Sequence, residues 1–520
     1  MKDKTERQPQ QSEQKNKQEK ELHYVDPFIL KKRHLILPII CTTLLYLAYL
    51  HSTPMILFTL TIYFIAYLNR RQIYKSNYYK KLSLWFMYRD IKKMSKNINQ
   101  TQMLLAKNLL NIPIKEGETE VKSFLDLIEN FGKKYPFMNM IKDTRNEKIW
   151  VEGTPMKCIS SYSYLSLTED ERVQNFALEQ AKKYSTGNHG PRMLCGNLVI
   201  LEDLEKDLAR FFNREAALVF SSGYLACMSA IAGIASKNDF IIMDKLCHAS
   251  LKAGVRLSAA GSAHYFGHNN FEEAESIIKR QRKSGQRLIM IIEGVYSMDG
   301  DIGNLEKARI ICDKYGGTLI VDEAHSLGTI GKTGHGTEEH FNYKYRADII
   351  CGTFSKSLAS VGGYIVCDKD LRTFYTLYAP GLVFSAPLSA YNTAAAMKAL
   401  QILEQEPEKT AKLQENSKYL RDRFKENGFN IGHSVTCVIP VIFNDPIQTM
   451  DLHYFMKQKG FFSAAVMAPA CPILEPRFRI TPNCTQKKED LDDIINVFVA
   501  ARNACLPHPA FKELKDVLGL

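Results

Sequence analysis

The feature of this sequence that most constrains its fold is the alternation of short apolar runs with helix-like segments between residues 216 and 367. A short apolar run bounded by polar turn residues is typical of a strand that is buried on both faces. Because these runs alternate with helical patterns, we predict βαβ units and a mainly parallel sheet covered by helices. The predicted strands are Ala216–Phe220, Phe240–Met243, Arg287–Ile292, Thr318–Val321, Ile349–Cys351 and Tyr364–Cys367.

Length and pattern together predict two domains after residue 145. The chain has 520 residues, which is too long for one ordinary core. We expect a large parallel-sheet domain over residues 146–390. Long helices followed by mixed helix and strand patterns predict a smaller α+β domain over residues 391–520.

Chemically useful side chains follow several of the predicted strands, at the edge where ligands of parallel sheets bind. A Ser-Ser-Gly stretch at a helix start can hold a phosphate through free N–H groups and the helix dipole. A lysine at a strand end among hydroxyls and glycines suits covalent catalysis through a Schiff base. Each group alone has a simpler interpretation, as a helix cap, a structural histidine, a salt bridge or a surface lysine. In chain order these groups are Ser221-Ser-Gly-Tyr224, His248, Asp322 with His325, and Lys356.

Taken together, the four groups are those that a phosphorylated pyridine aldehyde needs. The chain resembles the α-oxoamine synthase family of fold-type I pyridoxal-phosphate (PLP) enzymes over roughly residues 145–500. The resemblance implies an α/β fold-type I transferase with a large sheet domain and a smaller C-terminal domain. It is carried by Ser221-Ser-Gly-Tyr224, His248-Ala-Ser250, Glu293-Gly-Val-Tyr-Ser-Met-Asp-Gly-Asp301, Val321-Asp-Glu-Ala-His-Ser-Leu-Gly328 and Gly352-Thr-Phe-Ser-Lys356.

The resemblance also implies a role for each matching residue. Lys356 is expected to bond covalently to the cofactor, and Asp322 to keep the pyridine nitrogen protonated so that the ring accepts electrons. His325 is expected to contact the ring hydroxyl, and His248 to stack on the ring and help to hold the substrate carboxylate. Arg479 matches the arginine that pairs with the amino-acid carboxylate through a bidentate contact. The resemblance therefore assigns catalysis to Lys356, His248 and Asp322, and it adds cofactor contacts from Gly223, Tyr224, Ser297 and Thr353.

Two stretches bear on the substrate. Ser355 precedes the lysine, where the synthases of aminolevulinate, 8-amino-7-oxononanoate and 2-amino-3-ketobutyrate usually carry glycine. The stretches 352–360 and 469–475 are similar to those of serine palmitoyltransferases. This similarity implies condensation of L-serine with palmitoyl-CoA to 3-ketosphinganine, the first step of sphingolipid synthesis. The alternatives are another α-oxoamine synthase, using glycine or alanine with a different acyl-CoA, or a non-catalytic subunit of a membrane complex.

The sequence departs from the family pattern at three places, which bear on the substrate more than on the cofactor. The family commonly has Asn-x-Tyr-Leu-Gly where this chain has Ser163-Tyr-Leu-Ser166. Thr485-Gln-Lys487 replaces Ala-His-Thr, and Leu201 replaces a histidine. The family forms its sites between two subunits, so we expect a homodimer, or a heterodimer with a non-catalytic homologous subunit.

The N-terminal part carries a membrane signal. Residues 1–34 are rich in Gln, Lys and Glu and predict a disordered basic tail. The stretch Leu35–Leu68 is nearly free of charge and has basic residues on both sides, which predicts a membrane hairpin or a single kinked span. A buried soluble helix is the alternative.

Residues 69–145 are predicted to form an amphipathic juxtamembrane helix and a connector. Arg70 to Lys96 contains nine basic residues and one acid, with aromatic residues at helical spacing. A basic helix packed on its own globular domain is the alternative. We expect an endoplasmic-reticulum membrane location with the catalytic domain in the cytosol.

Charge and cysteine content exclude two classes of protein. Residues 1–150 carry 26 Lys and Arg against 14 Asp and Glu, whereas residues 151–520 carry 42 of each. The net charge of +12 therefore belongs to the N-terminal part, and a nucleic-acid-binding core is not expected. Twelve cysteines without a C-x-x-C pair indicate unpaired thiols in a reducing compartment, rather than a disulfide framework or a structural zinc site.

Overall fold

The computed structural model of the chain describes residues 141–145, 148–151, 153–467, 470–472 and 475–507. By its own contacts the chain divides at Glu129, and the second unit, Asn130–Leu520, contains every described residue. The predicted tail, membrane segment and juxtamembrane helix lie outside the described residues. Among the residues that are described, no helix is both long enough and apolar enough to cross a bilayer.

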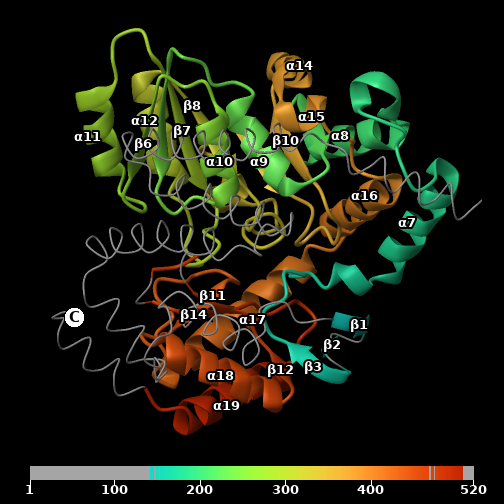
Figure 1. The fold of residues 1–520 in the computed structure, drawn as a ribbon, viewed down its shortest axis with the longest axis vertical. Coiled ribbons are helices and arrows are strands. Elements are labelled where there is room, and N and C mark those ends of the chain that lie inside the picture. Colours follow the sequence, from blue (N-terminus) through green and yellow to red (C-terminus); the bar gives the residue numbers. More distant parts are fainter. Residues whose placement is uncertain (1–140, 146–147, 152, 468–469, 473–474, 508–520) are drawn as a thin grey trace, which may run out of the picture. The chain divides into compact units, whose positions relative to one another are not determined.

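A seven-stranded sheet is the centre of the larger domain, in the order β4-β10-β9-β8-β7-β5-β6 (Figure 1). Strand β10 runs opposite to the other six strands, which share one direction, so the predicted, mainly parallel sheet is confirmed. All six predicted strands are present within one or two residues at each end. The seven strands are β4 (Ala216–Phe220), β5 (Asp239–Asp244), β6 (Ser262–Phe266), β7 (Arg287–Glu293), β8 (Gly317–Asp322), β9 (Ile349–Thr353) and β10 (Gly363–Cys367).

Strand β6 is the one strand of this sheet that the apolar runs did not indicate. It lies at the edge of the sheet and pairs only with β5. Its side chains alternate between partly exposed and exposed positions, apart from the buried Phe266. An edge strand that is half in contact with solvent does not need a continuous apolar run, so the pattern was too weak to detect.

The sheet is covered by helices on both faces because alternate strand residues point in opposite directions. Ala217 and Val219 of β4 join one core, with residues of α7, α8, α11, α12 and α16. Leu218 and Phe220 join the other core, with α9, α10, α14 and α15. The bounds are α7 (Glu171–Tyr184), α8 (Val199–Phe211), α9 (Gly223–Ala232), α10 (Ala249–Leu257), α11 (Phe271–Gln281), α12 (Leu305–Tyr315), α13 (Thr337–His340), α14 (Lys369–Tyr378), α15 (Pro380–Val383) and α16 (Ala390–Gln405).

Several of these helices begin at a residue whose side chain accepts a hydrogen bond from the first turn. Ser222 caps α9, Asn270 caps α11 and Asn304 caps α12 in this way. Ser and Asn are strongly preferred at this position because the side-chain oxygen satisfies an otherwise free backbone N–H group. The loops that connect strands to helices at the site are therefore specified locally.

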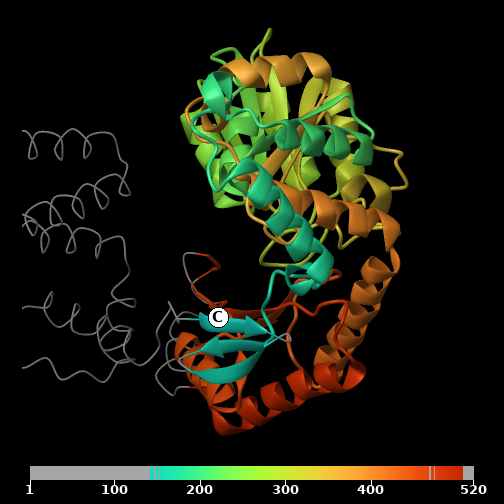
Figure 2. The ribbon, with the colours of Figure 1, turned by 90° about the vertical axis from the view of Figure 1, so that its right-hand side faces the viewer.

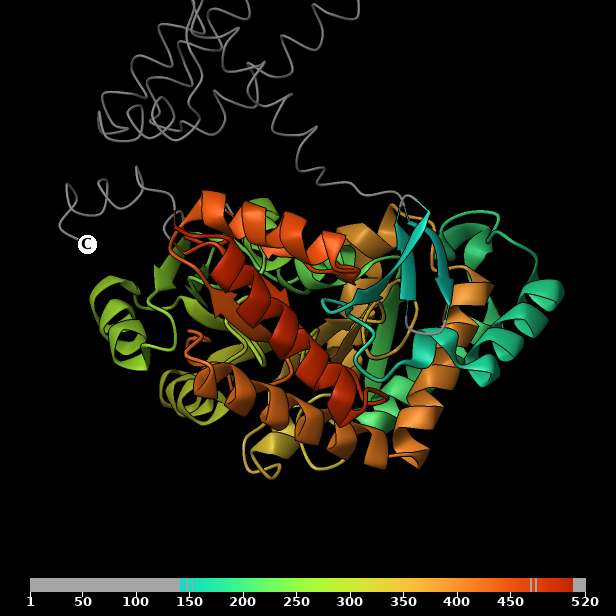
Figure 3. The same ribbon diagram turned by 90° about the horizontal axis from the view of Figure 1, so that it is seen from below.

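Within its described residues, the smaller domain contains two short sheets and three helices around its own core. Figure 3 shows α19 between α17 and α18. The ring of Phe498 in α19 packs edge to face with Phe424 of α17 and with Phe478 of β14. The first sheet is β1-β2-β3-β12, formed by β1 (Ile141–Arg145), β2 (Lys148–Val151), β3 (Thr154–Cys158) and β12 (Phe461–Phe462). The second sheet is β11-β14-β13, and its strands and the helices are β11 (Ile439–Ile442), β13 (Ala465–Val466), β14 (Arg477–Ile480), α17 (Glu408–Glu426), α18 (Pro446–Gln458) and α19 (Lys488–Ala504).

The first sheet joins segments from the two ends of the described chain. Strand β3 pairs in parallel with β12, about 300 residues later (Figure 2). Residues 148–158 therefore share a sheet with Phe461–Phe462, whereas the domain bounds given above stay a prediction. Single-sequence patterns do not reveal a pairing between two such distant strands, because each strand alone is too short.

Candidate active site

The carboxyl ends of β7, β8 and β9 lie next to one another across the sheet. Glu293 pairs with Asp322, and Asp322 pairs with Cys351. On the far side of β9, Thr353 pairs with Gly363, which in turn pairs with Phe220 at the end of β4. The sheet therefore brings the predicted cofactor and catalytic segments to one edge, as expected for a ligand site of an α/β sheet.

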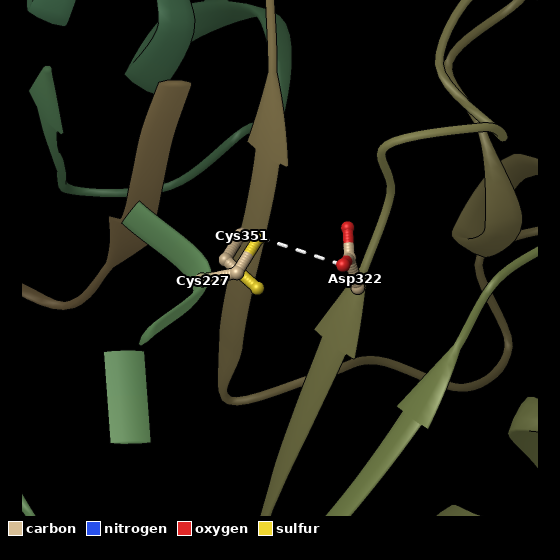
Figure 4. Close-up of side chains that lie close together, drawn as sticks. All are labelled: Cys227, Asp322 and Cys351. Carbon is tan, nitrogen blue, oxygen red and sulfur yellow. Dashed lines mark hydrogen bonds between the residues drawn. The ribbon is translucent and has the colours of Figure 1, made fainter. Parts of the chain in front are cut away.

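Asp322 is only 3% exposed, and a different donor holds each of its carboxylate oxygens. The backbone N–H of Ala324 donates to Oδ1 at 2.9 Å, and the thiol of Cys227 donates to Oδ2 at 3.4 Å (Figure 4). Cys351 is the third member of this buried group, whose ligand atoms all lie within 4.8 Å of one another. Its hydrogen bond with Cys227 and its burial raise the pKa of Cys351, so its thiol stays protonated and does not repel the carboxylate.

Lys356 follows β9 in a loop, with its amine partly buried. Burial lowers the pKa of Lys356 to about 8, although the charge of Asp322 acts in the opposite direction. An amine must be neutral to attack a carbonyl carbon, and a depressed pKa is the usual way to make a lysine nucleophilic. The environment of Lys356 therefore suits the covalent role predicted for it.

His325 is buried, and its Nδ1 lies 2.8 Å from the hydroxyl oxygen of Tyr164. Burial, and then the nearby positive charge of Lys356, lower the pKa of His325 well below its ordinary value, so the ring is neutral. Burial also raises the pKa of Tyr164, which keeps its hydroxyl protonated and able to donate. When Tyr164 donates to Nδ1, the single ring proton of His325 must be on Nε2. That tautomer gives His325 an N–H donor for a ring hydroxyl.

His248 begins α10, where its Nδ1 interacts with the hydroxyl of Ser250 at 2.7 Å. Burial lowers the pKa of His248. The carboxylate of Glu293 accepts a hydrogen bond from the backbone N–H of His248. Burial and the nearby charge of Asp322 raise the pKa of Glu293 well above its ordinary value. Glu293 thus anchors the backbone that carries His248 and itself favours the neutral form.

The start of α9 is the segment that we predicted to hold the phosphate. Ser222 uses its hydroxyl oxygen to cap Leu225 at 3.1 Å, which leaves the N–H groups of Gly223 and Tyr224 at the open end of the helix. A Cβ on Gly223 would lie 2.5 Å from the Cβ of Thr353, so the close approach of α9 to the end of β9 requires glycine. The hydroxyl of Thr353 donates to the carbonyl oxygen of Gly362 at 2.9 Å.

Two neighbouring arginines of β14 reach the same edge of the sheet and differ in their partners. Arg477 forms ion pairs with Asp299 and Glu475, each at 2.8 Å. Arg479 is 2% exposed and donates through Nη1 to the carbonyl oxygen of Ser297 at 3.3 Å. Within the described residues, Nη2 of Arg479 is buried without a hydrogen-bond partner. A buried guanidinium with an unused donor is suited to bind a carboxylate.

These observations fit a bound pyridine aldehyde phosphate and an amino acid. The helix start can hold the phosphate, Asp322 the ring nitrogen, His325 the ring hydroxyl, Lys356 the aldehyde carbon, and Arg479 the substrate carboxylate. Sequence reasoning assigned no role to four residues that the structure places here, namely Tyr162, Tyr164, Cys227 and Glu293. Glu293 begins one of the motifs that carried the resemblance. Its position directly after a predicted strand was the one sequence signal for a place in the site.

The departures from the family pattern have local structural roles. Ser166 has a φ of 53°, a left-handed conformation that favours glycine, and its hydroxyl interacts with that of Thr485 at 2.9 Å. The side chain of Gln486 accepts a hydrogen bond within its own loop, and Lys487 begins α19. Leu201 lies in α8 and is fully buried in the core.

Comparison with known proteins identifies the family. The family model for aminotransferase class I and II matches residues 158–498. A serine palmitoyltransferase of Bacteroides thetaiotaomicron is 36% identical over 370 residues, which are 71% of this chain and 93% of the relative. The chain is an α-oxoamine synthase of the class I and II aminotransferase family. Its cofactor is pyridoxal phosphate.

Relatives of this synthase do not all share one named activity. An 8-amino-7-oxononanoate synthase of Thermoanaerobacter pseudethanolicus is 32% identical over 378 residues, 73% of this chain and 95% of the relative. Among solved structures, the serine palmitoyltransferase of S. paucimobilis with a bound PLP–myriocin aldimine matches with a TM-score of 0.70 and 27% identity. The match covers 75% of this chain and 99% of that structure. These similarities show the family of the synthase without distinguishing its substrate.

Proposed function

We propose that this α-oxoamine synthase is a serine palmitoyltransferase, which condenses L-serine with palmitoyl-CoA to give 3-ketosphinganine, CoA and carbon dioxide. The observation that carries the use of an amino acid is the buried guanidinium of Arg479, with its unpartnered Nη2. The choice of serine is supported by the similarity to serine palmitoyltransferases and by Ser355 immediately before Lys356.

The side chains of the site have complementary tasks in this reaction. The bound cofactor supplies an electron sink for the carbanion character that develops at Cα of the amino acid. Asp322 provides a negative charge for the ring nitrogen, and His325 provides a neutral N–H donor for the ring hydroxyl. Lys356, with a pKa of about 8, can accept the Cα proton near neutral pH. In this proposal His248 orients the substrate carboxylate or polarises the thioester.

Membrane attachment is part of the same proposal. Its support comes from the sequence, because Leu35–Leu68 lies outside the described residues. A long-chain acyl-CoA and a sphingoid product both partition into bilayers, so an anchored enzyme meets its substrate at the surface. We propose a location at the endoplasmic-reticulum membrane with the catalytic domain in the cytosol.

The proposed assembly is a dimer, either with a second copy or with a non-catalytic homologous subunit. Intact Lys356, Asp322 and His325 support a catalytic chain rather than an inactive scaffold. An inactive subunit would have no need of a lysine whose pKa is depressed beside a buried carboxylate.

The test is a substrate matrix with the purified full-length chain in detergent. Serine, glycine and alanine are each offered with short, dicarboxylic and long-chain acyl-CoAs, and the condensed products are identified by mass spectrometry. We expect serine with palmitoyl-CoA to give the highest kcat/KM. Lys356→Ala is the control for catalysis, and retained activity in this variant would contradict the mechanism.

The second candidate is another α-oxoamine synthase, which uses glycine or alanine with a different acyl-CoA. The specific observation in its favour is that such relatives are nearly as similar to this chain as the serine palmitoyltransferases. A preference for alanine with a dicarboxylic acyl-CoA, or for glycine with a short one, would replace our proposal with this candidate.

A further inference from the structure

Tyr162 is at the centre of the site, although no role has been assigned to it. It lies in the loop between β3 and α7, and 42% of its surface is exposed. Its ring centroid is 3.9 Å from Cζ of Arg479, 6.0 Å from Nζ of Lys356 and 6.0 Å from the ring of His325. The closest of these contacts is a guanidinium group lying over an aromatic ring.

The groups that contact the guanidinium of Arg479 are uncharged. In the described part of the chain it donates to the Ser297 carbonyl oxygen at 3.3 Å, and its charge acts on the nearby Tyr164 hydroxyl. The neighbouring Arg477 has two carboxylates, from Asp299 and Glu475, at 2.8 Å. Arg479 has no such ion pair among the described residues, and the flat face of its guanidinium lies over the ring of Tyr162.

An aromatic face and a carboxylate stabilise a guanidinium group in different ways. A carboxylate binds in the plane of the group and occupies its N–H donors. An aromatic ring interacts with the flat face and leaves the in-plane donors free. A ring is therefore the partner that can hold Arg479 while its Nη2 remains available to a ligand.

We propose that Tyr162 is a positioning residue for the substrate, because its ring holds the guanidinium of Arg479 in the orientation that presents Nη2 to the carboxylate of the amino acid. This inference rests on the proposed use of an amino-acid substrate, but it does not depend on whether that substrate is serine. The acyl-CoA does not need this contact.

The experiment compares three variants in the full-length, cofactor-loaded protein. Tyr162→Leu removes the aromatic face, Tyr162→Phe keeps it, and Tyr265→Leu removes a similarly exposed tyrosine from β6 as a matched control. The L-serine dissociation constant is measured by calorimetry, and KM for each substrate and kcat by steady-state assay.

We expect Tyr162→Leu to weaken L-serine binding about 5- to 30-fold, the range for a cation over an aromatic ring. KM for palmitoyl-CoA should stay within about twofold. Tyr162→Phe should bind serine within about threefold of the parent chain, because Phe presents the same face. Tyr265→Leu should match the parent chain. Melting temperature and cofactor absorbance establish that each variant is folded and loaded.

A double-mutant cycle with Arg479→Lys identifies the route of the effect. We expect Tyr162→Leu to change serine affinity less than about twofold in the Arg479→Lys background, because the guanidinium plane is already gone. An unchanged serine affinity in Tyr162→Leu, or an equal loss in both backgrounds, would overturn the proposal. If the parent chain binds glycine or alanine in place of serine, the proposed function fails, and the same cycle with that amino acid still decides the role of Tyr162.

Discussion

Asp322 illustrates, at the scale of a single residue, how much of the site depends on groups that the chain provides before any ligand binds. A backbone N–H group orients one carboxylate oxygen and the thiol of Cys227 orients the other. A buried carboxylate without such donors would favour the protonated form and could not serve a cationic ring nitrogen. Cys227 therefore contributes to the electrostatics of the site, although a cysteine in a helix gives no sequence signal for such a role.

The Cys227 thiol can be tested by its removal. We expect Cys227→Ala to weaken cofactor binding about 2- to 10-fold, because it removes one hydrogen bond to Asp322 while the Ala324 contact remains. Cys312→Ala, at a fully buried position in α12, is the matched control and should leave cofactor affinity unchanged. The measurement is the dissociation constant of pyridoxal phosphate, obtained by absorbance titration of each cofactor-free variant and of the parent chain. Equal effects of the two substitutions would indicate a general packing defect.

Lys356 carries a prediction about pH. Burial lowers its pKa from 10.5 to about 8, so between these values the unfolded chain binds more protons than the folded chain. The cofactor-free protein should therefore become more stable as the pH rises from about 8 to 10.5, and Lys356→Met should abolish this increase. The measurement is the denaturant midpoint of both chains across this range.

The rate of cofactor capture should rise about tenfold between about pH 7 and 9 and then level off. A rate that climbs steadily past pH 10 would indicate an ordinary lysine.

At the scale of elements, the close approach of α9 to β9 determines the cradle. We expect Gly223→Ala to weaken cofactor binding and to destabilise the chain by about 1–3 kcal/mol, because the added Cβ would lie 2.5 Å from Thr353. Gly187→Ala is the matched control, since no atom lies within 4 Å of its added Cβ, and it should be neutral within about 0.5 kcal/mol. Chemical denaturation and cofactor titration report the two effects. A Gly223→Ala chain with unchanged cofactor affinity would mean that α9 can shift without harm to the cradle.

At the scale of the whole molecule, β14 of the smaller domain contacts the loop after β7 of the larger one. Arg477 supports this contact by donating to Asp299 and to the Met298 carbonyl oxygen. Arg479 donates to the same loop through Nη1 alone, which leaves Nη2 available. The two arginines are two residues apart on one strand and therefore point to the same side. One holds the domains together, and the other serves the site that forms between them.

This division of roles predicts opposite effects for matched substitutions. Arg477→Gln should lower the free energy of unfolding by about 1–3 kcal/mol, because two carboxylates lose their partner. Arg479→Gln should leave the free energy of unfolding unchanged or raised, since it removes a buried charge that has no acidic partner among the described residues. It should nevertheless weaken amino-acid binding at least about 100-fold. Thermal denaturation and calorimetric serine titration of both variants measure these outcomes, and a strong destabilisation by Arg479→Gln would contradict our view of it as a ligand-binding side chain.

Much of this architecture was predictable because it depends on patterns of neighbouring residues. The buried strands contain continuous apolar runs, and polar groups follow them in chain order, so Asp322, His325 and Lys356 could be proposed as site residues from sequence. The edge strand β6 and the pairing of β3 with β12 were not found. One is half exposed and the other joins two short segments that are distant in sequence.

The sequence by itself thus determined the strand order along the chain, the segments that form the site and the cofactor family. Only the tertiary structure showed that the ring of Tyr162 lies against the guanidinium of Arg479. It also showed the hydrogen bonds of Tyr164 with His325 and of Cys227 with Asp322. The physical reason is that apolar periodicity reports whether a segment is buried, whereas a contact between two segments depends on register and docking. Residues 162 and 479 are far apart in the sequence and belong to different segments, so no local pattern connects them.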